Sequence, residues 1–187
     1  MQFSRKNMTR RLAVGAMASC LTVATFAHAA LSSIGDSDVS FLAVGPGGLK
    51  IEGKTSDLSA SENAGVVIVT VGVDKLKTGI DMRDDHLRKA INANQHGDAI
   101  LKVKRSDLKF PADNAKVEGK AVGDFTLNGV TQKLPFAYKV ARTGSDYHVQ
   151  GLATVDYTKH KLEKPCYLGV CVDKEVKLKV QFKVREK

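Results

Sequence analysis

Apolar and polar residues alternate with a period of two along most of this chain, and no other feature constrains the fold as strongly. The pattern is clearest near the C-terminus: in residues 176–184 every even-numbered residue is apolar and every odd-numbered residue is Lys or Gln. Successive side chains of a β-strand point to opposite faces of a sheet, so this run predicts a strand with one buried and one solvated face.

Similar runs occur throughout the chain, separated by turn residues such as the GPGG cluster at 45–48 and the Asn128-Gly129 pair. Asn-Gly between alternating runs is a strong hairpin signal. Residues 31–38 are expected to form a polar lead-in, and residues 56–65 a connection. The predicted strands are 39–44, 49–55, 66–73, 99–104, 107–110, 115–127, 130–140, 147–157 and 176–184.

About eight amphipathic strands joined by short turns predict an all-β fold with an antiparallel sheet, which must close on itself or double over. Closure removes exposed strand edges. We therefore expect an eight-stranded antiparallel barrel, whose interior is either filled by side chains or able to hold one small ligand. A two-sheet sandwich is the alternative.

One mature segment, residues 78–94, has helical spacing instead. Asp81 is a plausible N-cap, with Asp84 and Asp85 in the first turn, and these two are spaced four residues from Arg88 and Lys89. The apolar stripe expected to be buried consists of Leu87, Ala90 and Ile91. A helix of about ten residues is marginal alone, so we expect it to pack near the opening of the barrel.

The first 29 residues have the features of a secretory signal peptide. A basic start precedes an uncharged apolar run over 12–26, and Ala27-His28-Ala29 matches a small-x-small cleavage site. We expect cleavage after Ala29, which leaves a single domain of residues 30–187. Lipoprotein processing at Cys20 and twin-arginine export through Arg10 and Arg11 remain alternatives.

Loss of this leader changes the charge of the chain. It takes away four basic residues and no acidic ones, which leaves 25 Lys and Arg against 20 Asp and Glu and lowers the net charge from +9 to +5. The remaining basic residues are scattered along alternating strands, a distribution that does not indicate nucleic-acid binding. Transient contact with anionic headgroups on a membrane surface stays open.

Cys166 and Cys171 are the two cysteines that remain in the mature chain. Their spacing matches neither a CxxC redox pair nor a haem-attachment motif. In an exported chain the pair predicts a structural disulfide bond.

The Asn128-Gly129 turn defines a register between the two strands that flank it. It places Gly123 opposite Leu134, Ala121 opposite Phe136 and Gly119 opposite Tyr138, so that large inward residues face small ones. If the next hairpin pairs Val140 with Tyr147, Phe136 also lies beside Gly151. The small residues either let the large side chains lie down and fill the barrel or leave it hollow.

Residues for catalysis or metal binding are sparse. Nucleophile-elbow, zincin and phosphate-loop motifs are absent from the sequence, and the mature histidines are far apart and expected at the surface. Arg83, Asp84 and His86 are a more concentrated polar group, expected at the mouth of the barrel, although helix capping and ion pairing also account for them. We expect no enzyme activity, no cofactor and no metal site.

Several segments resemble the YceI-like family of bacterial exported proteins. The matching stretches are DSDVSFLAVG, VTVGVDKLKTGIDMRDDHLRKAI, KVEGKAVGDFTLNGVTQKLPFAYKV and KEVKLKVQF, which together cover most of residues 36–182. The resemblance implies a lipocalin-like eight-stranded barrel in the periplasm that encloses a long isoprenoid or similar lipid. The chain departs from the family pattern at NANQHGDAILKV and at VDYTKHKLEKPCYLGVC, in loops expected to border the opening.

The expected function is thus a non-catalytic periplasmic carrier for a polyisoprenoid or an isoprenoid quinone. The alternatives are an adaptor or membrane-surface protein with a filled barrel, and an enzyme acting on a lipophilic substrate. The oligomeric state is not predicted. The candidate ligand-binding residues are Phe41, Ala121, Phe125, Leu134, Phe136, Tyr138, Val149, Gly151 and Val155.

Overall fold

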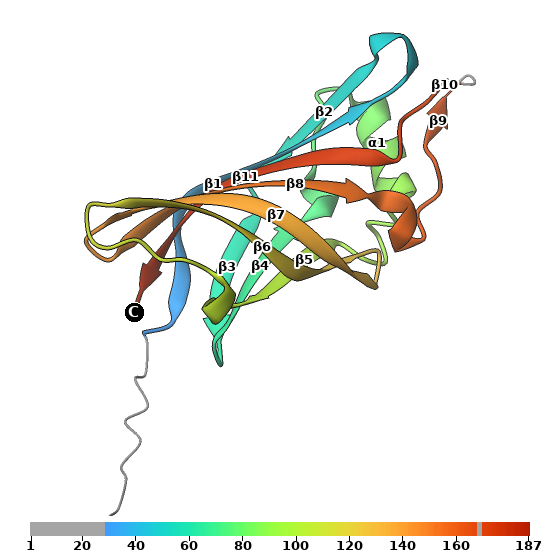
Figure 1. Ribbon diagram of the computed structural model, residues 1–187. Coiled ribbons are helices and arrows are strands. Elements are labelled where there is room, and N and C mark those ends of the chain that lie inside the picture. The colour runs from blue at the N-terminus through green and yellow to red at the C-terminus, as the bar shows by residue number, and fades with distance from the viewer. Residues whose placement is uncertain (1–28, 168–169) are drawn as a thin grey trace, which may run out of the picture.

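The computed structural model describes residues 29–167 and 170–187, so the predicted leader lies outside the described residues except for Ala29. Nine strands form one antiparallel sheet (Figure 1). They are β1 (Leu31–Val44), β2 (Lys50–Thr55), β3 (Leu58–Asn63), β4 (Val66–Gly72), β5 (Asp98–Lys104), β6 (Lys116–Leu127), β7 (Val130–Thr143), β8 (Asp146–Asp156) and β11 (Glu175–Glu186).

The sheet closes because β1 pairs with β11 along most of its length. β2 and β3 both pair with β1, β2 with its C-terminal half and β3 near its start, and together they occupy one position in the ring. The barrel therefore has eight strands, which confirms the predicted fold class. Successive strands are antiparallel, so every second connection lies at the same end of the barrel.

The register of the β6–β7 hairpin is the predicted one: Ala121 pairs with Phe136 and Gly119 with Tyr138. The register expected for the next hairpin is wrong by two residues, because Val140 pairs with Val149 and not with Tyr147. β7 and β8 continue to a tight turn at Gly144 and Ser145, where Gly144 has a φ of 61°. As a result Phe136 lies opposite Ala153 in β8.

Two strand segments differ from the prediction near the N-terminus. The lead-in at 31–38 belongs to β1, whose pairing with β11 shifts between Ile34 and Asp38, around a Gly35 with a φ of 62°. The connection predicted at 56–65 contains β3, which pairs with β4 over six residues. Both segments are rich in Ser and acidic residues, so neither shows a clear period-two apolar pattern.

The strand predicted at 107–110 is not formed. A 3-10 turn, η3 (Arg105–Asp107), is followed there by an irregular segment. The amide of Lys109 donates a hydrogen bond of 2.7 Å to the Tyr138 hydroxyl instead of to a neighbouring strand. Leu108 and Phe110 pack against the buried cluster at this end of the barrel, so their alternation reflects burial without strand pairing.

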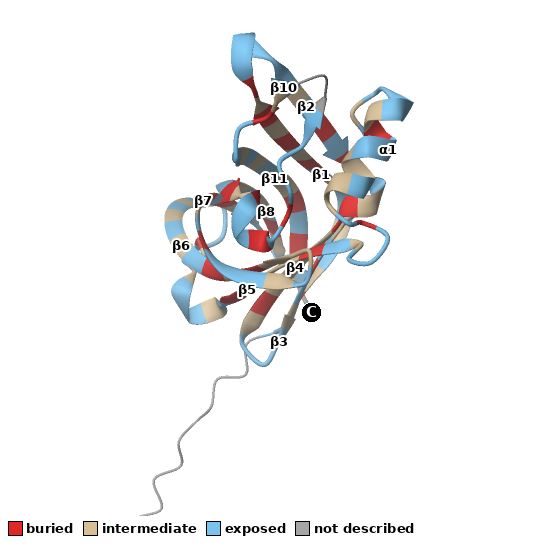
Figure 2. Ribbon diagram, turned by 90° about the vertical axis from the view of Figure 1, so that its right-hand side faces the viewer, coloured by how far each residue is buried: buried red, intermediate tan, exposed pale blue. Residues whose placement is uncertain are grey.

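Helix α1 (Asp81–Ala90) lies beside the opening of the barrel, which Figure 2 faces. Its N-cap is Ile80 and not Asp81, because Asp81 is already the first helical residue. Arg88 pairs with Asp85 three residues earlier and not with Asp84. Within the described residues, no helix combines the length and the apolar character needed to cross a membrane.

Three further 3-10 turns and one small hairpin complete the connections at the open end. The turns are η1 (Pro46–Gly48), η2 (Val73–Lys75) and η4 (Tyr157–His160). The hairpin of β9 (Cys166–Tyr167) and β10 (Val170–Cys171) forms its own two-stranded sheet.

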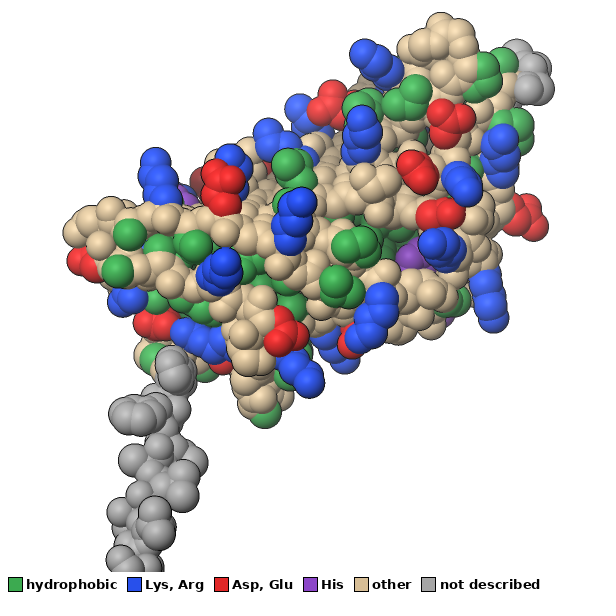
Figure 3. Space-filling model, viewed as in Figure 1, with side chains coloured by type: hydrophobic (Ala, Val, Ile, Leu, Met, Phe, Trp, Pro, Cys, Tyr) green, Lys and Arg blue, Asp and Glu red, His purple; other side chains and the backbone are tan. Residues whose placement is uncertain are grey.

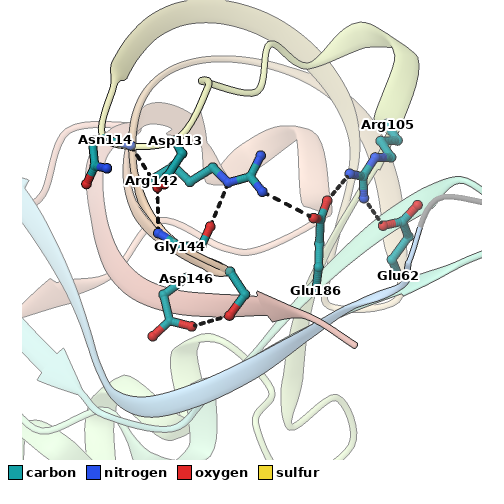
Figure 4. Close-up of polar contacts among 9 residues, drawn as sticks. Glu62, Arg105, Asp113, Asn114, Arg142, Gly144, Asp146 and Glu186 are labelled. Atoms are coloured by element: carbon teal, nitrogen blue, oxygen red, sulfur yellow. Dashed lines mark hydrogen bonds and ion pairs between the residues drawn. The ribbon is translucent and has the colours of Figure 1, made fainter.

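The opposite end of the barrel is closed by a charged cluster (Figure 4). The Arg105 guanidinium lies 2.5 Å from a Glu62 carboxylate oxygen and 2.7 Å from one of Glu186. It also stacks on the Phe110 ring at 4.3 Å. Burial alone would lower the pKa of Arg105, but the hydrogen bonds to Glu186 and Glu62 outweigh burial and raise it above its ordinary value.

Candidate functional site

The barrel is hollow. A cavity of about 1040 Å³ runs along its axis, with a wall built from Val, Leu, Ile, Phe and Ala side chains of both buried clusters. This volume lies at the upper end of the range of about 300–1,000 Å³ that is typical of ligand pockets. Val69, Val149 and Leu178 are among the apolar side chains that line the cavity. An eight-stranded barrel is wide enough to hold one small ligand.

Eight of the nine predicted ligand-binding residues lie on the cavity wall: Phe41, Phe125, Leu134, Phe136, Tyr138, Val149, Gly151 and Val155. Ala121 is not part of the wall. It packs against the buried cluster opposite Phe136, whose larger side chain reaches the cavity in its place. The structure places these residues at the cavity, while their role in binding stays a prediction.

The strand glycines do not create the hollow. A Cβ atom added to Gly119 would lie 2.5 Å from the Tyr138 ring, and one added to Gly123 would lie 2.6 Å from Leu101. Neighbouring side chains therefore lie over these glycines, as the filled-barrel interpretation expected locally. Gly151 does lie on the cavity wall, but a Cβ atom added there would lie 2.8 Å from Val180, so its missing side chain leaves little space of its own.

Sequence reasoning missed the contribution of β4. Val67, Val69 and Val71 of β4 and Val73 at the start of η2 all lie on the cavity wall. The run 66–73 is apolar on both faces, so its periodicity could not show which side faces inward. Pairing with β5, which places Val69 opposite Leu101, is the signal that distinguishes the two faces.

The open end of the cavity is bordered by α1. Leu87, Ala90 and Ile91, the predicted apolar stripe, face the cavity, as do the polar residues Arg83 and His86. Two of the three predicted mouth residues therefore lie where they were expected.

Asp84, the third predicted mouth residue, does not line the cavity, because it is buried with 1% of its surface exposed. One of its carboxylate oxygens accepts hydrogen bonds of 2.6 Å from both the amide and the hydroxyl of Thr78. Arg83 donates back to the same threonine, at 2.9 Å to the hydroxyl and 2.7 Å to the carbonyl. The group therefore ties the start of α1 to the segment before it.

The hydrogen bonds from the Thr78 hydroxyl and amide lower the pKa of Asp84 below its ordinary value. The carboxylate is therefore ionised at neutral pH. Lys77, 3.9 Å away, adds a favourable charge. This arrangement suits a structural anion that positions α1. It is not a helix cap, because the Asp84 carboxylate accepts from Thr78 before the helix and the Ile80 N-cap makes no side-chain hydrogen bond.

Cys166 and Cys171 form the predicted disulfide bond, which closes the β9–β10 hairpin. The hairpin is held next to the barrel because the Asp173 amide donates a hydrogen bond of 2.7 Å to the carbonyl of Val44 at the end of β1. The cysteine pair thus supports one side of the mouth.

One histidine differs from the prediction that all of them lie at the surface. His160, in η4, is 3% exposed. Its ring packs edge-on against Phe125 with 5.4 Å between centroids, and its Nδ1 lies 2.9 Å from the Val130 carbonyl. One polar contact of the ring, an aromatic neighbour and a hydrogen bond from the Asn128 side chain to the His160 carbonyl make this a packed structural residue. No group of three or more His, Cys, Asp or Glu residues suited to a metal ion occurs in the described part of the chain.

Comparison with known proteins agrees with this geometry. The family model of the YceI-like domain matches residues 19–184. A UPF0312 protein of Ectopseudomonas mendocina (strain ymp) is 33% identical over 101 residues, which are 51% of this chain and 48% of that protein. The match thus spans about half of that relative.

Two solved structures share the fold. A polyisoprenoid binding domain from Saccharophagus degradans, implicated in plant cell wall breakdown, superposes with a TM-score of 0.73 at 16% identity, covering 85% of this chain and 99% of that one. BcnA of Burkholderia cenocepacia superposes with a TM-score of 0.62 at 16% identity, covering 79% and 95%. At such identities the likeness establishes the fold alone.

Proposed function

The chain belongs to the YceI-like domain family, and from this membership and the barrel's interior we propose that it is a non-catalytic binding protein for a long-chain lipid. A polyisoprenoid or an isoprenoid quinone is the expected class of ligand. The observation that carries the proposal is the apolar cavity of about 1040 Å³. The polyisoprenoid binding domain from Saccharophagus degradans, which has the same fold, supports the ligand class.

The cavity suits a hydrocarbon chain because its wall offers burial and few polar partners. Burial contributes about 0.8 kcal/mol per CH₂ group, so two or three isoprene units supply a gross gain of about 10 kcal/mol before the costs of association. Affinity then depends on chain length more than on any single contact. A headgroup would remain near the mouth, beside Arg83 and His86.

We place this binding protein in the periplasm, carrying its ligand between donor and acceptor membranes. Support comes from the predicted leader, residues 1–29, and from the Cys166–Cys171 bond, since disulfides persist in oxidising compartments. The filled-barrel adaptor is disfavoured by the cavity itself. An enzyme is disfavoured because Arg83 and Asp84 are both engaged by Thr78.

The direct test is native mass spectrometry and lipid extraction of the protein isolated from the periplasm. The expected result is a co-purifying lipid whose mass corresponds to a prenyl or quinone chain. Protein that is consistently ligand-free and takes up no added prenyl lipid or quinone would contradict the proposal.

A matched pair of variants links retention to the cavity. Ala153 lies on the cavity wall opposite Phe136, so Ala153→Phe places a ring in the lumen. Thr154, the next residue of β8, is exposed, so Thr154→Phe adds the same ring outside. Lipid retention should fall at least tenfold, about 1.4 kcal/mol, in Ala153→Phe and stay unchanged in Thr154→Phe. Equal retention in both variants would place the lipid elsewhere.

A further inference from the structure

Large apolar side chains are exposed at the mouth of the barrel. Among the described residues, six large hydrophobic side chains are exposed, and four of them surround the opening. These four, called the mouth rim, are Leu49, Ile80, Met82 and Val170, and Met82 is the most exposed at 66%. The other two, Val122 and Leu152, lie in β6 and β8 of the barrel wall.

The mouth rim is assembled from three segments that are distant in sequence. Leu49 follows η1, Ile80 and Met82 begin α1, and Val170 starts β10. All four also line the cavity, so the exposed apolar surface is continuous with the apolar interior. A chain entering or leaving the lumen at this end passes over these side chains.

Charge is distributed unevenly between the two ends. The connections at the mouth, residues 45–49, 56–57, 73–97, 128–129 and 157–174, carry nine Lys and Arg against seven Asp and Glu. Those at the closed end, residues 64–65, 105–115 and 144–145, carry two of each sign. Figure 3 shows Lys and Arg side chains at the right-hand end, near α1 and the β9–β10 hairpin, interspersed with acidic and apolar side chains. The mouth thus combines exposed apolar groups with net positive charge.

We propose that the mouth rim docks onto an anionic lipid bilayer, with its apolar side chains inserted among the headgroups and the cavity opening towards the acyl chains. The combination of apolar insertion and basic flanks is the one by which peripheral proteins bind anionic membranes. Docking lets a lipid chain move between bilayer and lumen without crossing water. This inference rests on the proposed function for its purpose but is tested without any ligand in the cavity.

Tryptophan fluorescence tests the insertion directly, because the chain contains no Trp. Met82→Trp places a single reporter on the mouth rim, and Val122→Trp places the matched control on the barrel wall. The vesicles contain phosphatidylcholine with about 30% phosphatidylglycerol. Emission of Met82→Trp should shift to the blue and be quenched by brominated acyl chains, while emission of Val122→Trp should not change. Identical behaviour of the two reporters would overturn the proposal.

Loss of binding gives an independent test. Ile80→Ser/Met82→Ser removes two exposed side chains of the mouth rim, and Val122→Ser removes one side chain of the barrel wall that is as exposed as Ile80, 52% against 53%. In vesicle co-sedimentation, affinity should fall about tenfold in the double variant and remain unchanged in Val122→Ser. Raising NaCl from 0.05 to 0.5 M should weaken wild-type binding by a similar factor of about ten.

The outcomes separate docking from lipid carriage. Ala153→Phe, which blocks the cavity, should bind these vesicles as wild type does. Vesicle binding by a protein that retains no lipid would support docking and contradict the proposed function alone. Wild-type protein that does not bind vesicles, or that loses as much affinity through Val122→Ser as through the rim substitutions, would overturn docking and leave the mouth rim to a protein partner.

Discussion

Gly119 lacks a side chain at the point where the Tyr138 ring crosses its strand. A Cβ atom there would lie 2.5 Å from both Cζ and Oη of Tyr138. The ring cannot move away freely, because its hydroxyl accepts the hydrogen bond from the Lys109 amide at 2.7 Å. One glycine thus lets a tyrosine in β7 hold the irregular segment that follows η3.

Gly119→Ala should therefore lower the free energy of unfolding by about 1–3 kcal/mol, the usual cost of overpacking. Urea unfolding followed by circular dichroism measures this change. The control is Glu118→Ala, which removes an exposed partner of Lys139 and should cost within about 1 kcal/mol. A loss for Gly119→Ala no larger than that of the control would show that Tyr138 has room to move.

At the scale of single residues, the sequence predicted which side chains share a face of the sheet. It did not predict how far each side chain extends into the barrel. The Asn128-Gly129 turn was sufficient to pair Ala121 with Phe136, and the structure confirms that pair. Whether the ring fills the centre or lines a hollow depends on the radius of the closed barrel. That radius depends on all eight strands together and cannot be predicted from any single strand.

Helix α1 is positioned by one buried carboxylate. Asp84 accepts two hydrogen bonds from Thr78, and Gly79, between them, takes a φ of 82° to bring the chain into the helix. The start of the helix carries Ile80 and Met82 of the mouth rim. The geometry of the mouth therefore depends on an ionised group.

Asp84→Asn should lower the melting temperature at pH 7. The difference in melting temperature from wild type should narrow below about pH 4. The sign follows from the lowered pKa of the folded state: such a carboxylate contributes its stabilisation above the unfolded pKa, and this is lost as pH falls through the folded pKa. Thermal melts of both proteins at several pH values measure the effect. Asp85→Asn, at a position with a 63% exposed side chain, is the control. A difference in melting temperature that stays constant across the whole pH range would contradict a stabilising role of the ionised Asp84 carboxylate.

Elements with strong alternation were predictable, and those without it were not. The run that became β11 alternates without interruption and was predicted within two residues at each end. β3 was missed because Ser59 and Ser61 leave only Leu58 and Ala60 as its apolar pattern. The segment 107–110 was assigned wrongly because Leu108 and Phe110 alternate yet find no strand partner. The local pattern of apolar residues indicates which side chains are buried, whereas strand pairing depends on residues that are distant in sequence.

At the scale of the whole molecule, the two ends of the barrel differ. The open end carries α1, the disulfide-linked hairpin and the mouth rim, whereas the closed end is sealed by aromatic side chains and the cluster around Arg105. The eight-stranded closure was predictable from strand number and from the need to remove edges. The closed-end cluster was not, because Glu62, Arg105 and Glu186 come from three remote parts of the chain.

Arg105→Ala should lower the free energy of unfolding by about 3–5 kcal/mol, because it leaves the buried Glu62 without its counter-charge and Glu186 with the more distant Arg142, at 3.9 Å. The Glu62 side chain is 6% exposed and that of Arg105 14%, so water replaces the lost partner poorly.

Arg185→Ala is the matched control. Arg185 also pairs with a carboxylate, that of Asp146, but the Arg185 side chain is 51% exposed. Its loss should therefore cost at most about 1 kcal/mol. Added NaCl at 0.5 M should reduce the effect of Arg185→Ala and leave that of Arg105→Ala nearly unchanged, since buried pairs are screened less. Equal costs for the two variants in urea unfolding would mean that the closed end is wetter than its packing indicates, and that the barrel is held shut by strand pairing alone.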